Sequence, residues 1–399
     1  MLNKTILLVN DHIRLSGGGD AVIYLEKRFL ESWGYKVFTI GFGDSTESNN
    51  GNYLIDLPKN SKVEKLNKFI TGKRIKKEFT SLVNEIQPDL IHIHLISKFP
   101  LSIYSSDALK GVPVIQTLHG PNLFCATSWG GLKTSGPCEL KIDPKCYVRG
   151  CTSLINTGLY WQLQSRYWAS LENKISAFHC PSLNILNTAK RLGLSNSKYI
   201  PLGIDQIFME EPRRIETLRP TLLFAGALAE QKGVKFLLPA LAEIKKDFPT
   251  VLLKIAGRGN LLSLLKDEVE RLDLGKHVEF LGFVPHEQIR EFYLSGDIFL
   301  MPSIWQEQFG LVGPEAMACK LPCIATNVGG IPEWLIHNYN GLLIPPQDVD
   351  AIVEAVKKLL SDKNKRLEMG ERGRDFVIQE FSPAGYEEGL KNMISELIS

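Results

Sequence analysis

The sequence predicts two α/β domains, each built on a parallel sheet with helices on both faces. Three observations lead to this prediction. Short apolar strand patterns alternate with helix-period patterns along most of the chain. Glycine-rich loops follow several of the strands. The length of 399 residues exceeds what one hydrophobic core usually supports.

The first domain is expected over residues 1–205. An apolar strand at 4–10 is followed by a glycine turn and by a helix with one apolar face, made of Val22, Leu25, Phe29 and Leu30. Further strands are expected at 37–41, 90–94, 113–118 and 177–181. The segment 120–157 is rich in Gly, Pro and Cys and has no clear period, which predicts a long loop of the functional kind.

The pattern restarts after a charged, proline-containing linker. A second domain is expected over residues 206–372, and residues 373–399 are predicted to form a helix that packs back near the hinge. Its strands are expected at 221–225, 251–256, 278–281, 298–301, 323–326 and 341–344. Ligands of such sheets bind beyond the carboxyl ends of the strands, so two facing domains of this kind imply a cleft between them.

The composition is that of a globular protein without a membrane-spanning segment. Hydrophobic residues make up 44% and charged residues 23% of the chain. No run approaches the roughly 18 apolar residues that a span needs. The first ten residues indicate a strand rather than a secretory signal, so a cytoplasmic protein is expected.

Charge is distributed unevenly, although the net charge is only +2. The first 200 residues carry 24 Lys and Arg against 15 Asp and Glu, and the remainder carries 22 against 29. Much of the basic excess lies between residues 59 and 77, at Lys59, Lys62, Lys65, Lys68, Lys73, Arg74, Lys76 and Lys77. This segment is either a solvated helix face or a peripheral contact with anionic lipid headgroups at the inner membrane face. Nucleic acid is not expected, because aromatic residues do not alternate with the basic ones.

Four of the seven cysteines gather in the long loop, at Cys125, Cys138, Cys146 and Cys151. A disulfide framework is not expected in a cytosolic chain. Their spacings lack the close pairs of common zinc sites, so reduced thiols are favoured over a zinc cluster.

Three strand–loop–helix junctions have the features of anion cradles. Gly17 and Gly18 lie in the first, Lys232 in the second, and Gly329 with Gly330 in the third. Glycine lets backbone N–H groups approach a ligand, a helix N-terminus favours an anion, and a lysine neutralises a diphosphate. None of the three matches the dinucleotide-binding GxGxxG pattern, which argues against an oxidoreductase.

The second domain also contains a pair of carboxylates that could bind hydroxyl groups. Glu307 lies in the loop after a strand, and Glu315 lies eight residues later in the following helix. Each carboxylate can accept two hydroxyl hydrogen bonds, as from a ribose or a hexose. Phosphate cradles together with polyol acceptors match the parts of a sugar nucleotide.

The chain resembles the family 4 group of retaining glycosyltransferases, which have the two-domain GT-B fold. The Glu307–Glu315 spacing, followed by Ala-Met-Ala, is the most specific part of the resemblance. The segments Gly329 to Glu333 and Asn340 to Leu342 also fit. In the first half, the glycine turn and the segments Pro88 to His92 and Thr117 to His119 are similar to the family pattern.

The resemblance implies roles for individual residues. His119, Glu307 and Lys232 would be catalytic, with His119 contacting the donor sugar and Lys232 stabilising the leaving diphosphate. The donor-binding residues would be Gly17, Gly18, Arg258, Phe283, Val284, Phe309, Gly310, Leu311, Glu315, Gly329 and Gly330. The donor would be a UDP- or GDP-linked sugar, the acceptor a glycan or a lipid-linked sugar, and neither a metal nor another cofactor would be required.

Two positions depart from the family pattern. Ala227 stands where many members have an arginine, and Leu202 stands where they have an asparagine. The first change removes one contact to the diphosphate. Two alternatives therefore stay open, a sugar-nucleotide epimerase of the same fold and a non-catalytic nucleotide-sugar-binding protein.

Overall fold

The computed structural model describes residues 4–11, 18–43, 51–56, 61–94, 99–120, 123–125, 142, 144–213 and 217–398, without the side chains of 18–21, 61–71, 156, 159, 163 and 169. The chain divides into two compact units. The first consists of Met1–Pro201 with Glu387–Ser399, and the second of Leu202–Tyr386.

The first unit contains a seven-stranded parallel sheet in the order β3-β2-β1-β4-β5-β6-β7. Its strands are β1 (Thr5–Val9), β2 (Lys36–Phe42), β3 (Asn52–Ile55), β4 (Leu90–Ile93), β5 (Val114–Thr117), β6 (Ala177–Cys180) and β7 (Ser197–Tyr199). The central strands β4, β5 and β6 are buried along their whole length, because helices cover both faces of the sheet. The sequence pattern did not predict the two edge strands, β3 and β7, which are only partly buried.

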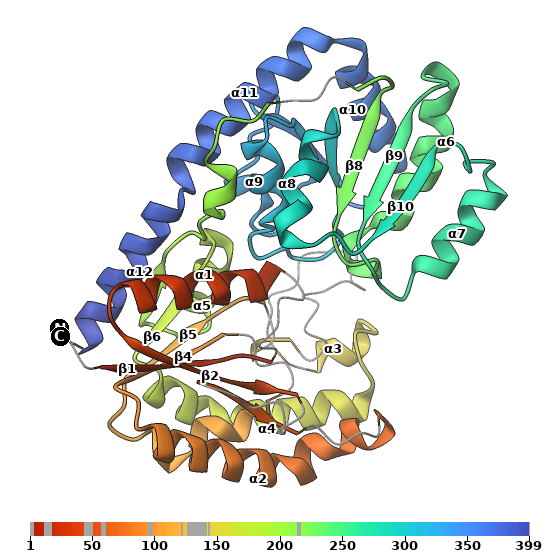
Figure 1. The fold of residues 1–399 in the computed structure, drawn as a ribbon. Coiled ribbons are helices and arrows are strands. Elements are labelled where there is room, and N and C mark those ends of the chain that lie inside the picture. The colour runs from red at the N-terminus through yellow and green to blue at the C-terminus, as the bar shows by residue number, and fades with distance from the viewer. Residues whose placement is uncertain are drawn as a thin grey trace. The chain divides into compact units, whose positions relative to one another are not determined.

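Helices α2 and α4 lie on one face of this sheet and α1 on the other (Figure 1). The helices are α1 (Gly18–Ser32), α2 (Ser61–Ile86), α3 (Lys145–Val148), α4 (Leu154–Lys174) and α5 (Leu183–Arg191), with 3-10 turns at Leu101–Ser105 and Asp107–Leu109. The chain moves to one side of β1 through α1 and to the other side through α2. Right-handed crossovers therefore place these two helices on opposite faces.

The segment predicted as a long loop contains helical structure in its described part. Helix α3 and the first turn of α4 fall within residues 120–157. Their apolar residues do not form one buried face, since Val148 and Ile155 are exposed, and this explains why no helical period is visible in the sequence.

The second unit contains a six-stranded parallel sheet in the order β10-β9-β8-β11-β12-β13. Its strands are β8 (Thr221–Ala225), β9 (Leu252–Ala256), β10 (Val278–Gly282), β11 (Ile298–Met301), β12 (Cys323–Thr326) and β13 (Gly341–Ile344). Two doubly wound parallel sheets confirm the predicted fold class.

The helices of the second unit alternate with its strands. They are α6 (Leu237–Asp247), α7 (Leu262–Arg271), α8 (His286–Leu294), α9 (Val312–Ala318), α10 (Val349–Ser361), α11 (Lys363–Glu380) and the start of α12 (Pro383–Ile398), with 3-10 turns at Gln206–Phe208, Glu230–Lys232, Val234–Phe236 and Ile331–Glu333. Helix α12 continues into the residues that belong to the first unit. Leu237, Leu241 and Ile244 of α6 pack on the sheet in one apolar core. Within the described part of the chain, no helix combines the length and the apolar character that crossing a bilayer requires.

Close backbone approach at the end of β9 requires glycine. Gly257 has φ +147°, and a Cβ atom placed there would lie 1.8 Å from the carbonyl oxygen of Gly226, which follows β8. The loops after β8 and β9 can therefore run side by side only without a side chain at this position.

Replacement of this residue tests the constraint. We expect Gly257→Ala to lower the free energy of unfolding of the second unit by about 2–4 kcal/mol, because both the backbone conformation and the contact become strained. Urea denaturation followed by tryptophan fluorescence measures the loss. Gly275→Ala is the matched control, since no atom lies within 4 Å of the added Cβ. Equal losses in the two variants would contradict the explanation.

Candidate functional site

The carboxyl ends of four strands in the second unit position the candidate donor site. The strand order reverses at β8, whose neighbours are β9 on one side and β11 on the other. The loops after β8 and β11 therefore diverge and leave room for a ligand, as at other switch points of parallel sheets. The loops after β9 and β12 flank them.

Lys232 and Glu307 form the centre of this site. Lys232 Nζ donates a hydrogen bond to Glu307 Oε1 at 2.7 Å, and Ser303 Oγ donates to the same oxygen at 2.6 Å. The Glu307 side chain is 4% exposed, whereas Lys232 is 25% exposed, so the ammonium faces solvent on one side. The sequence patterns assigned these two residues to different parts of a donor, and the structure brings them into direct contact.

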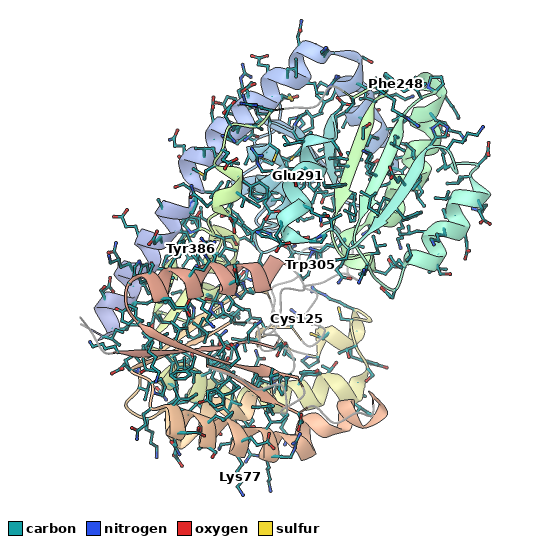
Figure 2. All side chains as sticks on the ribbon, in the orientation of Figure 1. Lys77, Cys125, Phe248, Glu291, Trp305 and Tyr386 are labelled. Carbon is teal, nitrogen blue, oxygen red and sulfur yellow. The ribbon has the colours of Figure 1, made fainter. Side chains whose placement is uncertain are left out.

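Trp305 also contacts this pair, and the sequence analysis did not single it out. It lies in the loop after β11 (Figure 2), with its ring centroid 5.0 Å from Lys232 Nζ. Its buried indole N–H has no acceptor among the described residues. The sequence could have pointed to Trp305, because this residue lies between the end of a strand and the predicted carboxylate of Glu307.

The glycine loop after β12 packs on the backbone of Glu307. Gly329 has φ +57°, and a Cβ there would lie 2.0 Å from the Glu307 carbonyl oxygen. The N–H of Gly330 donates to this carbonyl at 2.7 Å. The N–H of Gly329 has no acceptor among the described residues. Of the two predicted glycine amides, it is therefore the one that is available to bind an anion.

Glu315 has a separate environment on helix α9. The hydroxyl of Tyr293, on α8, donates to Glu315 Oε2 at 2.9 Å. Burial raises the pKa of Glu315, and this hydrogen bond opposes the rise. The sequence analysis did not predict this contact.

The remaining predicted donor residues divide into exposed and buried groups. Arg258 and Phe283 follow β9 and β10, and the Arg258 guanidinium lies 5.6 Å from the Phe283 ring centroid. Val284 is half-buried beside Phe283. By contrast, the Phe309 side chain is buried against Phe381, with ring centroids 5.0 Å apart.

The other predicted positions lie at loop and helix ends. Gly310 has φ +82° and precedes Leu311, the N-cap of α9. Ala227 is exposed in the loop after β8. Gly18 is the first residue of α1, and Gly17 lies outside the described residues.

His119 follows β5 in the first unit and ends a chain of polar side chains. His94 Nδ1 and His119 Nε2 are 3.0 Å apart. His94 Nε2 and His92 Nδ1 each lie 3.0 Å from the same oxygen of Glu26, on helix α1. Glu26 and His92 are fully buried, and His94 is 1% exposed.

A second arm runs from His92 across the sheet. His92 Nε2 lies 2.7 Å from Thr117 Oγ1, and the same hydroxyl lies 3.0 Å from His179 Nδ1. His179 Nε2 donates to the carbonyl of Ile200 at 2.8 Å. Hydrogen bonds therefore connect the side chains of β4, β5 and β6, and the buried Glu26 carboxylate of α1 lies beside His92 and His94.

The charges in this network follow from its burial. Burial by itself would raise the pKa of Glu26, but the charges of His92 and His94 beside it hold it well below its usual range. Burial lowers the pKa of His94, that of His119 well below its usual range, and that of His179 to about 4. Glu26 is therefore ionised at neutral pH, and these three imidazoles are neutral.

Three buried side chains of this cluster carry atoms of the kind that ligate metal ions. Glu26, His92 and His94 could each offer one ligand atom within 4.8 Å of the others. His92 Nδ1 and His94 Nε2 each lie 3.0 Å from the same carboxylate oxygen, but neither contact has hydrogen-bond geometry. Within the described part of the chain, Cys125, Cys146 and Cys151 are in no disulfide bond, and Cys138 lies outside the described residues.

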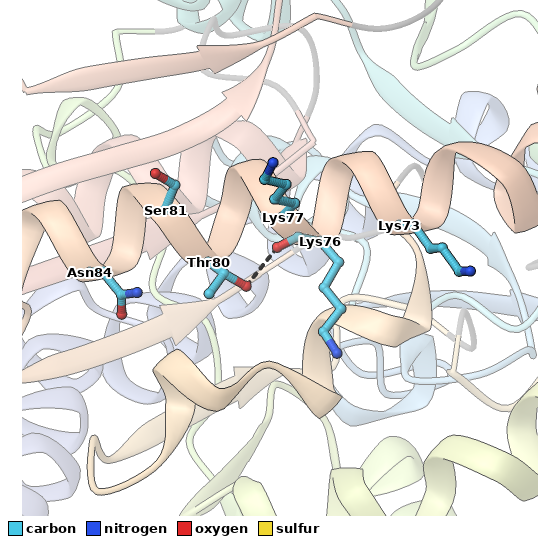
Figure 3. A pocket seen from close by; sticks show the side chains of 6 residues that line it. All are labelled: Lys73, Lys76, Lys77, Thr80, Ser81 and Asn84. Atoms are coloured by element: carbon cyan, nitrogen blue, oxygen red, sulfur yellow. Dashed lines mark hydrogen bonds between the residues drawn. The ribbon is translucent and has the colours of Figure 1, made fainter.

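The basic segment forms part of α2. Lys59 lies outside the described residues, and the side chains of Lys62, Lys65 and Lys68 are not described. Lys73, Lys76 and Lys77 line an open hollow together with Thr80, Ser81 and Asn84 (Figure 3). Lys76 donates to Ser105 at 2.9 Å, and Arg74 pairs with Glu78 at 2.9 Å, so half of the four described basic residues have partners.

The histidine network makes the first unit sensitive to acid. Below pH 6.5 the unfolded chain binds protons at these histidines, whereas folded His179 does not until about pH 4. The contribution of these neutral histidines to the free energy of unfolding is therefore fully present above pH 6.5 and is lost as the pH falls toward 4. The lowered pKa of His179 alone reduces the free energy of unfolding by about 2 kcal/mol from pH 7 to pH 5. Hydrogen exchange, corrected for intrinsic rates, should show this loss in β4, β5 and β6, with β8 and β11 as the internal control. An equal loss in both units would contradict the assignment to this network.

In a comparison with known proteins, two family models match consecutive parts of this chain. The model described as Glycosyltransferase Family 4 matches residues 16–206, and the one described as Glycosyl transferases group 1 matches residues 205–376. An uncharacterized glycosyltransferase of Methanocaldococcus jannaschii is 34% identical over 40% of this chain and 41% of its own length. A GDP-mannose-dependent alpha-(1-6)-phosphatidylinositol monomannoside mannosyltransferase of Mycobacterium tuberculosis is 32% identical over 45% of this chain and 51% of its own length. The chain thus spans about half the length of these curated relatives.

Solved structures share the fold over almost the whole chain. Sucrose-phosphate synthase from Thermosynechococcus elongatus has a TM-score of 0.79 at 20% identity, covering 99% of both chains. The Anabaena protein HepE, in complex with UDP and glucose, has a TM-score of 0.73 at 17% identity, covering 99% of this chain and 100% of that one. With the two family models matched end to end and the GT-B architecture shared over its length, the chain belongs to the family 4 glycosyltransferases.

Proposed function

We propose that this chain transfers a hexose-type sugar from a UDP- or GDP-linked donor to a glycan or a lipid-linked sugar, with retention at the anomeric carbon. The observation that carries the proposal is the arrangement around Lys232 and Glu307 at the switch point of the second sheet. One cation, one amide without an acceptor and one carboxylate converge where a sugar diphosphate would bind.

The Lys232–Glu307 pair supports a role in releasing the diphosphate. The Lys232 ammonium carries two N–H bonds besides the one directed at Glu307, and these can donate to phosphate oxygens. The Lys232 ammonium would lie where negative charge develops as the bond from sugar to diphosphate breaks. The N–H of Gly329 would add a backbone donor on the same side.

The two carboxylates would bind the hydroxyls of the donor. Glu307 retains one carboxylate oxygen beyond the one that Lys232 and Ser303 contact, and this oxygen can accept from a sugar hydroxyl. Glu315, held by Tyr293, would accept from the ribose. The exposed Phe283, with Arg258 beside it, would provide a stacking surface for the base.

The acceptor would bind to the first unit, whose loops carry no equivalent of the Lys232–Glu307 pair among the described residues. Two relatives in the comparison are named as GDP-mannose-dependent enzymes acting on a phosphatidylinositol mannoside. Together with the basic face of α2, this supports an acceptor at an anionic membrane surface.

Donor turnover tests the proposal. Wild type should release nucleotide from one member of a UDP- and GDP-sugar panel, in the presence of chelator. We expect Lys232→Ala and Glu307→Gln to lower kcat by about 10²–10³-fold, because each removes stabilisation of the transition state. Glu315→Gln should instead raise the KM for the donor about tenfold, since ribose contacts are made equally in the ground state.

Glu270→Gln, on the exposed face of α7, is the matched control and should behave as wild type. Binding of a donor without nucleotide release, even with acceptors present, would identify a non-catalytic binding protein. Recovery of an epimerised donor would identify an epimerase.

The basic face of α2 generates a separate prediction. Lys73 and Lys77 are exposed and have no ion pair among the described residues. Their double replacement by Glu should weaken binding to vesicles containing anionic lipid by about tenfold or more, because each lysine near such a surface contributes about 1 kcal/mol. Co-sedimentation at several salt concentrations measures this. The double replacement of Lys266 and Lys276 by Glu in the second unit is the control, and an equal effect there would indicate net charge rather than a defined face.

A further inference from the structure

The cluster of Glu26, His92 and His94 lies outside the donor site and contains two ring nitrogens that the hydrogen bonds of the sheet do not use. Glu26 and His92 are fully buried, and His94 is 1% exposed. His92 Nδ1 and His94 Nε2 have no hydrogen-bond partner among the described residues. We propose that these three side chains bind one divalent transition-metal ion of the Zn²⁺ type, which ties helix α1 to strand β4. The proposal goes beyond the proposed function and does not depend on turnover.

The proton of His92 can be followed from the far end of the hydrogen-bonded chain. The carbonyl of Ile200 only accepts, so His179 donates from Nε2 and, because burial keeps this imidazole neutral, accepts at Nδ1. The hydroxyl of Thr117 has one proton, which it donates to His179 Nδ1. Its oxygen then accepts from His92 Nε2. A neutral His92 therefore has a lone pair, and no proton, at Nδ1.

This nitrogen of His92 lies beside the Glu26 carboxylate. His92 Nδ1 is 3.0 Å from Glu26 Oε2, and the contact does not have hydrogen-bond geometry. In a neutral ring, two electron-rich atoms therefore lie side by side in the interior, and in an imidazolium the Nδ1–H has no acceptor. Both arrangements are costly away from water. A cation bound to both atoms removes the conflict, because each of them is then a ligand.

His94 supplies a third ligand atom at the same place. Its Nε2 also lies 3.0 Å from Glu26 Oε2, and the three atoms all lie within 4.8 Å of one another. Two ligands about 2.1 Å from one ion are about 3 Å apart when they subtend roughly a right angle at it. Two imidazoles and one carboxylate are a donor set that Zn²⁺ and Fe²⁺ accept, and a water molecule would fill a further position. A neutral His94 and an ionised Glu26 are the protonation states that such ligands need.

The outer nitrogens of both rings are held by neighbouring side chains. His92 Nε2 lies 2.7 Å from Thr117 Oγ1, and His94 Nδ1 lies 3.0 Å from His119 Nε2. Contacts of this kind orient ligating imidazoles and leave the opposite nitrogen for the ion. Since Glu26 comes from α1 and the two histidines come from the β4 segment, the ion would act as a cross-link between this helix and the sheet.

Metal analysis of the full-length protein, produced without a polyhistidine tag in medium containing Zn²⁺ or Co²⁺, tests the proposal. Brief dialysis against a chelator first removes ions bound at the surface. We expect about one ion per chain to remain, because enclosed ligands release it only when the structure opens locally. Glu26→Gln should lower the affinity for Zn²⁺ by about 100-fold or more, measured by competition with a chromophoric chelator, since it removes a charged ligand.

His277→Gln is the matched control, because it removes a histidine of the second unit that lies outside the cluster. It should bind the ion as wild type does. Absence of a bound ion from the wild type after chelation would overturn the proposal. Equal losses of affinity in Glu26→Gln and His277→Gln would also overturn it.

Co²⁺ spectroscopy of the wild type identifies the ligands even if the Glu26 variant does not fold. The proton NMR spectrum of the Co²⁺ form should contain two strongly shifted, exchangeable imidazole N–H signals, one from each ligating histidine. The electronic spectrum should lack a charge-transfer band from thiolate to cobalt. Such a band would place the ion at the cysteines of residues 120–157, and fewer than two shifted imidazole signals would exclude the histidine pair, so that either result would contradict the assignment.

Discussion

Burial of parallel strands on both faces is the constraint on which this structure depends. Such strands are covered by helices, so a polar side chain within one has no access to water and must find a partner in the protein. In the second unit the strands are mostly apolar, and the buried hydroxyls of Thr221 and Thr326 donate to the carbonyls of Arg219 and Ser303. In the first unit His92, Thr117 and His179 lie within strands and hydrogen-bond to one another across the sheet, with the buried Glu26 carboxylate of α1 beside His92.

Much of the fold could be predicted from the sequence, since strand and helix periods alternate so regularly. The central strands of both sheets lie where the apolar runs predicted them. The edge strands β3 and β7 could not be predicted, because they are short and only partly buried. Helix α3 was missed for a related reason, because none of its residues is buried.

The candidate site shows a different limit. Glu307, Glu315 and Lys232 were predicted from their places in strand–loop–helix junctions, but contacts between them could not be. Lys232 and Glu307 are 75 residues apart in sequence and meet only because β8 and β11 are neighbours in the sheet. Glu26 offered a signal that was overlooked. It lies four residues after Val22 and four before Leu30, and thus on the buried face of its helix. An acid at such a position indicates a buried partner.

The buried carboxylates of Glu307 and Glu26 differ in how readily their partners can be exchanged. Glu307 pairs with a lysine that is 25% exposed, so the ammonium can turn part of its hydrogen bonding toward an arriving phosphate without leaving the pair. Glu26 pairs with histidines that are fully enclosed, and separating them would leave an unpaired charge away from water. The first arrangement suits a group that must respond to the ligand, and the second suits a group that must not move. In the proposed transfer from a sugar diphosphate, the charge on the leaving group changes during the reaction, and the partly exposed lysine is the arrangement that could respond to this change.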